Sequence, residues 1–190
     1  MNPKDAARKI RRLAETTAAL RDSTEKHFEV TRLTSLKSLC QERDVAMRFG
    51  LYLAERAREQ MQDKPPYSSL DDVQWDRYKQ LAAKVVAAMQ VYLTSPTKTR
   101  HEALCKHLSQ VREAQDETER PMGKYTVRII HSTHLLVIEH ALECFTSLEP
   151  GYWAYQAARQ YAERFDSRYG TGLNPASASP LEDILHFWTG

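Results

Sequence analysis

Glycine and proline are scarce in this sequence, and their placement limits the fold more than any other feature. Six of the 190 residues are glycine and eight are proline. The prolines fall at breaks between periodic segments, where they do not interrupt helical hydrogen bonds. Between the breaks, apolar residues recur at three- and four-residue spacing, which is the period of an amphipathic helix. The sequence therefore predicts an all-α protein, a helical bundle of about six to eight helices, with no strand and no internal repeat.

Breaks that contain capping residues define the expected helix boundaries. The strongest break, DKPPYSSLDD at residues 63–72, contains two adjacent prolines, and Ser69 with Asp72 is expected to cap the next helix. Residues 114–124, AQDETERPMGK, are predicted to be a loop because they are polar and contain Pro and Gly. Helices are expected to begin at Asn2-Pro3, near Val45, after Ser69, at Ser95-Pro96, near Arg128, at Pro150 and at Ser179-Pro180.

Chain length and hydropathy bound the class of protein. The length fits a single helical domain, residues 1–190, with possible lobes at residues 1–62 and 63–190. No apolar run approaches the ~20 residues that span a bilayer, and the N-terminus lacks the apolar stretch of a secretory signal. We therefore expect a cytoplasmic protein with no membrane partner.

The three cysteines do not form a recognisable metal or disulfide motif. Cys40, Cys105 and Cys144 are odd in number, widely spaced and without a C-x-x-C pair. Each stands among apolar positions with helical spacing, so all three are expected to be small buried residues. No cofactor and no metal site is expected.

The segment RIIHSTHLLVIEH, residues 128–140, concentrates three histidines and raises the question of a catalytic or metal site. At about 100° per residue, His134 falls in the middle of the apolar stripe of a helix, His131 at its edge and His140 away from both. A metal site needs ligands that converge on one face, and only His131 and His134 could do so. The pattern therefore predicts a central core helix.

A small helical ribonuclease of the HEPN kind is a less favoured alternative. Arg128 followed by His134 matches the loose R-x(4–6)-H pattern of these enzymes, although Arg21–His27 and Arg100–His107 match it equally well. On one straight helix, Arg128 and His134 would diverge by roughly 120°, whereas a catalytic pair must share a pocket. Because motifs for phosphate-binding loops and nucleophile elbows are also missing, we expect a protein without enzymatic activity.

Basic residues offer a stronger lead than the histidines. Residues 1–62 carry 13 Lys and Arg against 9 Asp and Glu, whereas residues 139–190 carry 3 against 7. Near the N-terminus the basic residues recur at i, i+4 and i+8, which forms one ridge that could follow a phosphate backbone. The alternative is an ordinary solvated face balanced by neighbouring glutamates. The candidate nucleic-acid-binding residues are Lys4, Arg8, Lys9, Arg12, Arg48, Arg56, Lys98, Arg100 and Lys106.

The C-terminal segment PGYWAYQAARQYAERFDSRYGTGLNPASASPLEDILHFW carries a family resemblance. An aromatic helix leads through R-Y-G-T-G-L-x-P-x-S to a short capped helix. This layout resembles the C-terminal helical region of the large subunit of type I-D CRISPR surveillance (Cascade) complexes, which is also made separately as the small subunit. A chain that begins at a capped helix, Met1-Asn2-Pro3, fits such an internal start.

The resemblance implies a non-enzymatic subunit that is present in several copies. Its expected partners are the target DNA strand, the duplex of guide RNA and target, other subunits of the complex, and copies of itself stacked head to tail. A basic front and an acidic tail suit such stacking. The resemblance carries no residue-level motif, so the candidate binding residues rest on the charge pattern alone. The alternative from another class is a helical protein-interaction or scaffold module that binds no nucleic acid.

Overall fold

A computed structural model describes most of the chain. The described residues are Arg8 and residues 40–61, 71–116, 119–122, 125–128, 133–164 and 180–189. Their elements, in chain order, are α3 (Arg43–Glu59), α4 (Asp72–Thr94), α5 (Lys98–Asp116), β1 (Glu119–Met122), β2 (Tyr125–Arg128), α6 (Thr133–Thr146), α7 (Pro150–Arg164) and α8 (Pro180–Thr189). The expected all-α helical bundle is confirmed, with six helices among the described residues.

Local sequence signals explain where several helices begin. The side chain of Asp71 accepts a hydrogen bond from the Gln74 amide, and the Gln74 side chain accepts one from the Asp71 amide. This reciprocal capping box starts α4 two residues after the expected cap at Ser69. The starts of α7 at Pro150 and of α8 at Pro180 agree with the sequence prediction, because proline is well suited to the first turn of a helix. The expected helix at Asn2-Pro3 lies outside the described residues.

The segment predicted to be a loop holds a helix end and a β-hairpin instead. Helix α5 continues to Asp116, and β1 pairs antiparallel with β2, so that Glu119 faces Arg128 and Met122 faces Tyr125. Two residues, one of them glycine, connect the strands, and Tyr, Thr and Val in the second strand favour extended backbone. The prediction of no strand was therefore wrong here, and Arg128 lies in β2 rather than on the helix of His134.

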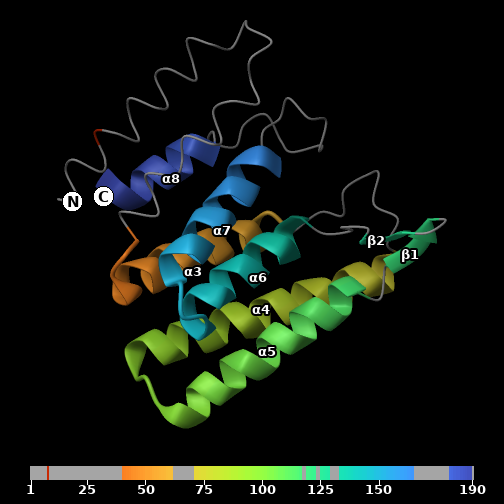
Figure 1. The fold of residues 1–190 in the computed structure, drawn as a ribbon, viewed down its shortest axis with the longest axis horizontal. Coiled ribbons are helices and arrows are strands. Elements are labelled where there is room, and N and C mark those ends of the chain that lie inside the picture. Colours follow the sequence, from red (N-terminus) through yellow and green to blue (C-terminus); the bar gives the residue numbers. More distant parts are fainter. Residues whose placement is uncertain are drawn as a thin grey trace, which may run out of the picture.

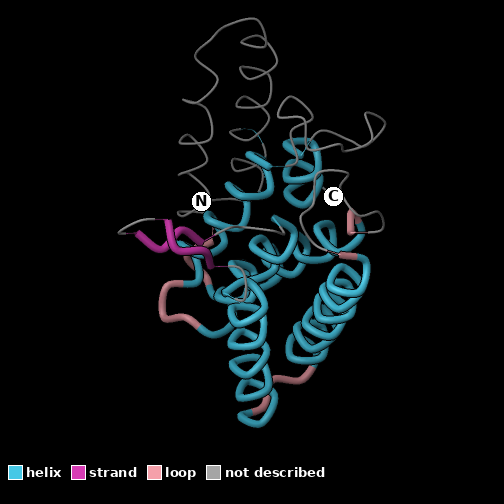
Figure 2. The backbone as a smooth tube through the Cα atoms, turned by 90° about the vertical axis from the view of Figure 1, so that its right-hand side faces the viewer, coloured by secondary structure: helices cyan, strands magenta, loops and turns pink. Residues whose placement is uncertain are grey.

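Helix α6 lies at the centre of the bundle. It packs against α3, α4, α5 and α7, and every residue from His134 to Phe145 is buried except the half-buried His140. Helices α4 and α5 form an antiparallel pair below the other helices in Figure 1, with the β-hairpin at the end of this pair that is opposite its turn. Figure 2 shows the same hairpin at one edge of the helices. The prediction of a central core helix is confirmed, although it begins at Thr133.

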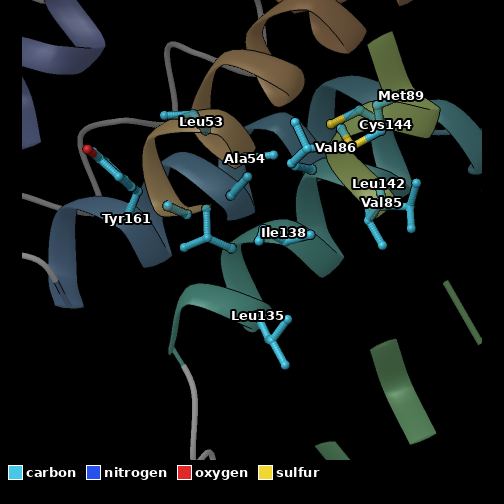
Figure 3. Close-up of a cluster of buried hydrophobic side chains, with 14 of the residues drawn as sticks. Leu53, Ala54, Val85, Val86, Met89, Leu135, Ile138, Leu142, Cys144 and Tyr161 are labelled. Carbon is cyan, nitrogen blue, oxygen red and sulfur yellow. The ribbon is translucent and has the colours of Figure 1, made fainter. Parts of the chain in front are cut away.

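The core draws apolar side chains from all of these helices. Figure 3 shows buried side chains from several helices, among them Leu53 and Ala54 of α3, Val86 and Met89 of α4, and Ile138 of α6. Helix α8 extends this core over α3, because Ile184 is fully buried and the Phe187 ring lies 4.9 Å from that of Phe49. Asp183 ties α8 to α7 by accepting a hydrogen bond from the Tyr161 hydroxyl at 2.5 Å. Helices α3 to α8 therefore share one hydrophobic core.

Helices α3 and α6 approach closely at Gly50. A Cβ atom at this position would lie 3.0 Å from Cys144 Sγ and 3.1 Å from the Ala141 carbonyl oxygen. Ala46, Ala54 and Ala57 continue a row of small residues along the buried face of α3. Because glycine costs about 1 kcal/mol relative to alanine inside a helix, Gly50 indicates that close packing outweighs helix propensity here.

Substitution of Gly50 tests this packing. Gly50→Ala gains about 1 kcal/mol of helix propensity but forces contacts that typically cost about 1–3 kcal/mol. We expect a net loss of about 1 kcal/mol in the free energy of unfolding, measured by urea titration. The loss should shrink in a Cys144→Ala background, because Sγ is the nearest atom. Ala83→Gly, at an exposed position of α4, measures the propensity cost alone. A stabilising Gly50→Ala would show that α3 is not held at this distance.

Candidate functional site

The candidate basic residues of α3 are engaged in local ion pairs. Arg48 Nε lies 2.8 Å from Asp44 Oδ2, and Arg56 Nη1 lies 2.9 Å from Glu59 Oε2. The Arg56 guanidinium also lies over the Tyr52 ring, 5.3 Å from its centroid. Hydrogen bonding to Asp44 raises the pKa of Arg48 further above its ordinary value. These exposed pairs add little stability, but each places a carboxylate beside a cation expected to bind phosphate.

The candidate residues of α5 are less constrained. Lys98 is nearly fully exposed, and its ammonium lies 3.9 Å from Glu102 Oε1. Arg100 donates from Nη1 to the Ser95 carbonyl oxygen at 2.5 Å, so its guanidinium holds the end of α4. Lys106 is exposed and has no carboxylate within 4.0 Å among the residues that the structure describes. Of the three, Lys106 is the best placed to contact a polyanion.

The N-terminal ridge is only partly described. Arg8 is exposed and has helical backbone. Lys4, Lys9 and Arg12 lie outside the described residues. The prediction that these four residues form one ridge therefore stays a prediction.

Two basic residues of α4 were missed by the sequence analysis. Arg77 and Lys84 are exposed, and within the described ranges neither lies within 4.0 Å of a carboxylate. They are seven residues apart, so they share the side of α4 opposite the buried Trp75 and Val86. The sequence signal for them is their i, i+7 spacing on the side of the helix that carries no apolar stripe. Lys98 and Lys106 of α5 also point to solvent. We call these four exposed residues the α4–α5 cations: Arg77, Lys84, Lys98 and Lys106.

A buried charged centre joins α5 to α6. Arg112 of α5 pairs through Nε with Glu139 Oε1 at 3.3 Å and through Nη2 with Glu143 Oε1. Gln115 donates to the other oxygen of Glu139 at 2.7 Å, and Thr146 donates to Glu143 at 3.3 Å. Both carboxylates are buried, one helical turn apart on α6. One guanidinium therefore bridges two carboxylates that would otherwise be costly to remove from water.

Several acidic residues of the C-terminal segment turn inward. The segment 139–190 has seven Asp and Glu, of which Glu139 and Glu143 are buried and Asp183 accepts the Tyr161 hydroxyl. The formal net charge of the chain is +2. Arg112 and the two glutamates together contribute −1, so all other residues together carry +3. The acidic tail thus contributes less to the surface than its sequence suggests. This weakens the charge argument for head-to-tail stacking and strengthens the argument for a basic exterior.

The histidines do not converge. His134 is buried against Trp75 of α4, with ring centroids 5.9 Å apart in an edge-to-face arrangement. Burial lowers the pKa of His134 to about 4, so its imidazole is neutral near pH 7. His140 packs against Trp153 of α7, with ring centroids 5.3 Å apart. His131 lies outside the described residues. A buried neutral His134 is poorly placed for the acid–base chemistry that a HEPN-type site requires.

The cysteines differ from the prediction in one case. Cys40 and Cys144 are buried as expected, and burial raises the pKa of the Cys40 thiol to about 12. Cys105 is exposed, so its predicted burial was wrong. It lies on the side of α5 away from Leu104 and Leu108, with Sγ 3.9 Å from His101 Nδ1. The described part of the chain holds no cluster of three or more His, Cys, Asp or Glu side chains suited to a metal ion.

Comparison with known proteins gives no relative. No protein-family model matches the chain, and no curated protein or solved structure matches it. The resemblance to the type I-D CRISPR subunit therefore stays a prediction. In the described ranges, none of the helices combines the length and the apolar character needed to cross a membrane.

The charged centre should be essential as a unit. Arg112→Met removes the guanidinium that bridges two buried carboxylates and should lower the free energy of unfolding by about 3 kcal/mol at pH 7. Adding Glu139→Gln and Glu143→Gln should restore most of the loss, because the uncompensated charges are removed. Arg48→Met, which breaks an exposed pair, should cost much less than Arg112→Met. Urea titration measures all three. Equal losses for Arg112→Met and Arg48→Met would contradict this role.

Protonation of His134 should oppose folding. Its pKa is about 4 in the folded chain and about 6.5 when unfolded, so the unfolded chain binds more protons between these values. Stability from this group is complete above pH 6.5 and is lost as the pH falls toward 4. Between pH 7.5 and 5 the loss should be about 2 kcal/mol. Urea titrations of the wild type and of His134→Gln, which does not titrate, should diverge by this amount. Parallel curves would show that His134 keeps its usual pKa.

Proposed function

We propose that this chain is a non-enzymatic, sequence-nonspecific nucleic-acid-binding subunit of a larger cytoplasmic assembly. The resemblance at its C-terminal end favours a CRISPR effector complex of the Cascade type, with the chain as a small subunit. It would hold the target or displaced DNA strand, or the guide–target duplex, through phosphate contacts. Several copies would lie side by side along the complex.

The observation that supports this proposal is the segregation of charge between interior and exterior. Glu139 and Glu143 face Arg112 inside the bundle, whereas Arg77, Lys84 and Lys106 face outward without a close carboxylate among the described residues. Among the described residues, the buried charged side chains are Glu139 and Glu143, so these two negative charges contribute little to the surface. Lysine and arginine side chains that extend from a helix into solvent suit contacts to phosphates, which carry no sequence information.

The mechanism is electrostatic. Each ammonium or guanidinium group that neutralises a phosphate releases condensed counterions, and this release drives binding at moderate salt. The α4–α5 cations would supply part of these contacts, and the N-terminal ridge with Lys4, Arg8, Lys9 and Arg12 would supply others. Arg48 and Arg56 contribute less in this scheme, because Asp44 and Glu59 already lie beside them.

The second candidate function is a helical scaffold that binds protein but no nucleic acid. The local pairing of Arg48 and Arg56 favours it, since such pairs are typical of an ordinary solvated helix face. The two functions differ in a simple property of the purified protein. Copurifying nucleic acid raises the ratio of absorbance at 260 nm to that at 280 nm, and a scaffold would show the ratio of protein alone.

Neutralising the three α4–α5 cations that lack a close carboxylate tests the proposal. We expect Arg77→Gln, Lys84→Gln and Lys106→Gln together to weaken binding to a labelled single-stranded oligonucleotide more than tenfold. They should also reduce the slope of log affinity against log salt by about 2, since each lost phosphate contact removes about 0.7. The measurement is fluorescence anisotropy over a series of salt concentrations.

A matched double variant serves as the control. Arg48→Gln with Arg56→Gln removes two cations that are already paired, so affinity should fall less than threefold. Absence of binding by the wild-type protein at low salt would refute the function. Binding that is insensitive to salt would refute the phosphate mechanism.

A further inference from the structure

The segment between α6 and α7 and the first turn of α7 each carry one exposed apolar side chain. Leu148 is 94% exposed and Tyr152, one turn into α7, is 39% exposed. The other large exposed apolar residues of the described chain, Val73 and Val91, lie at opposite ends of α4. Leu148 and Tyr152 are four residues apart, so the segment between α6 and α7 is where two such residues occur close together in the described sequence. We call it the α6–α7 corner.

Hydrogen bonds hold this corner in one conformation. The Ser147 hydroxyl oxygen accepts hydrogen bonds from the Glu149 amide at 3.1 Å and from Trp153 Nε1 at 3.0 Å. The Trp153 ring in turn lies edge to face with that of Tyr152, with centroids 5.2 Å apart. Its other neighbour is the His140 ring of α6. Tyr152 is therefore an aromatic side chain on a rigid support, which lowers the entropy that a ligand must remove on binding.

A cation is fixed at the same turn. Arg43 donates from Nη1 to the Phe145 carbonyl oxygen at 3.1 Å and from Nη2 to the Ser147 carbonyl oxygen at 2.5 Å. The guanidinium therefore satisfies the free carbonyls at the end of α6 and brings a positive charge to the corner. Arg43 remains exposed, so a further donor can reach a ligand.

We propose that the α6–α7 corner is a stacking site for an unpaired base of single-stranded nucleic acid, with Tyr152 under the base and Arg43 beside its phosphate. This inference rests on the proposed function and names its ligand class. Exposed aromatic rings beside basic groups bind single strands because every base offers a π-face. A duplex keeps its base faces stacked and cannot use such a ring.

The size and charge of the corner favour a base over a protein partner. A stable protein interface buries about 800 Å² on each side, and two side chains provide far less apolar surface. A single base needs little more than one ring. Glu149, within the turn, is the group that opposes this ligand, because its carboxylate repels phosphate. Glu149→Gln should therefore tighten binding.

The test compares Tyr152→Ala and Tyr152→Phe on a thymidine 20-mer and on a duplex of the same length. Tyr152→Ala should weaken single-strand binding about tenfold, as loss of a stacking ring does elsewhere, and leave duplex binding within twofold. Tyr152→Phe keeps the ring and should bind as the wild type does. Binding of the oligonucleotides should also change the fluorescence of Trp153 in the wild type. Thermal unfolding followed by circular dichroism checks that each variant is folded.

The possible failures are distinguishable. If the wild-type protein binds neither nucleic acid at low salt, the proposed function itself is wrong and this inference falls with it. If the wild type binds but Tyr152→Ala retains full single-strand affinity, phosphate binding stands and the stacking site is wrong. An equal loss on single strand and duplex would also overturn stacking, because a duplex offers no free base.

Discussion

The close crossing of α3 and α6 is the contact on which the other features depend. Gly50 lets the two helices approach until a Cβ atom would touch Cys144 and the Ala141 carbonyl. At this distance the start of α3 lies against the end of α6, so Arg43 can reach the carbonyl oxygens of Phe145 and Ser147. The residue before Gly50, Phe49, presents its ring to Phe187 of α8. A wider crossing would separate Arg43 from α6 and would loosen both the α6–α7 corner and the docking of α8.

The second constraint is that α6 is buried on nearly all sides yet carries two glutamates. A helix in this position must either be apolar throughout or bring its own counter-charge from a neighbour. Arg112 of α5 provides that charge from the half-exposed edge of the bundle, and Gln115 completes the hydrogen bonds of Glu139. Residues of a different helix thus stabilise the buried carboxylates of α6. A consequence is that α5 cannot slide along α6 without breaking the pairing, so the register of these helices is fixed.

Local patterns predicted what is local in this fold. The apolar stripes gave α3, α4 and the core position of α6, and the prolines marked the starts of α7 and α8, because these features depend on a few neighbouring residues. The β-hairpin was missed because its strands are four residues each, too short for period-2 alternation to outweigh their Pro, Gly and charged residues. The Arg112 centre joins residues 27 and 31 positions apart, so no spacing rule could reveal it. Arg77 and Lys84 could be predicted from helical spacing, but they stand apart from the denser basic runs of the sequence. The N-terminal ridge, the strongest of these runs, is described only at Arg8.

The division between arginine and lysine bears on how such a surface would bind. Arg43, Arg56, Arg100 and Arg112 each use their planar guanidinium to hold a carbonyl, a ring or a carboxylate within the protein. Arg58 and Arg77 are exposed and lie within 4.0 Å of no carboxylate among the described residues. Lys84, Lys98 and Lys106 extend a compact, strongly hydrated charge to solvent. Lysine suits phosphate contact without fixed geometry, since its three donors rotate freely and do not demand a bidentate partner. Binding through these lysines alone would depend strongly on salt and would not discriminate one nucleic acid from another. Discrimination between single strand and duplex would then rest on a contact of another kind, and Tyr152 at the α6–α7 corner is the exposed aromatic ring that can provide it.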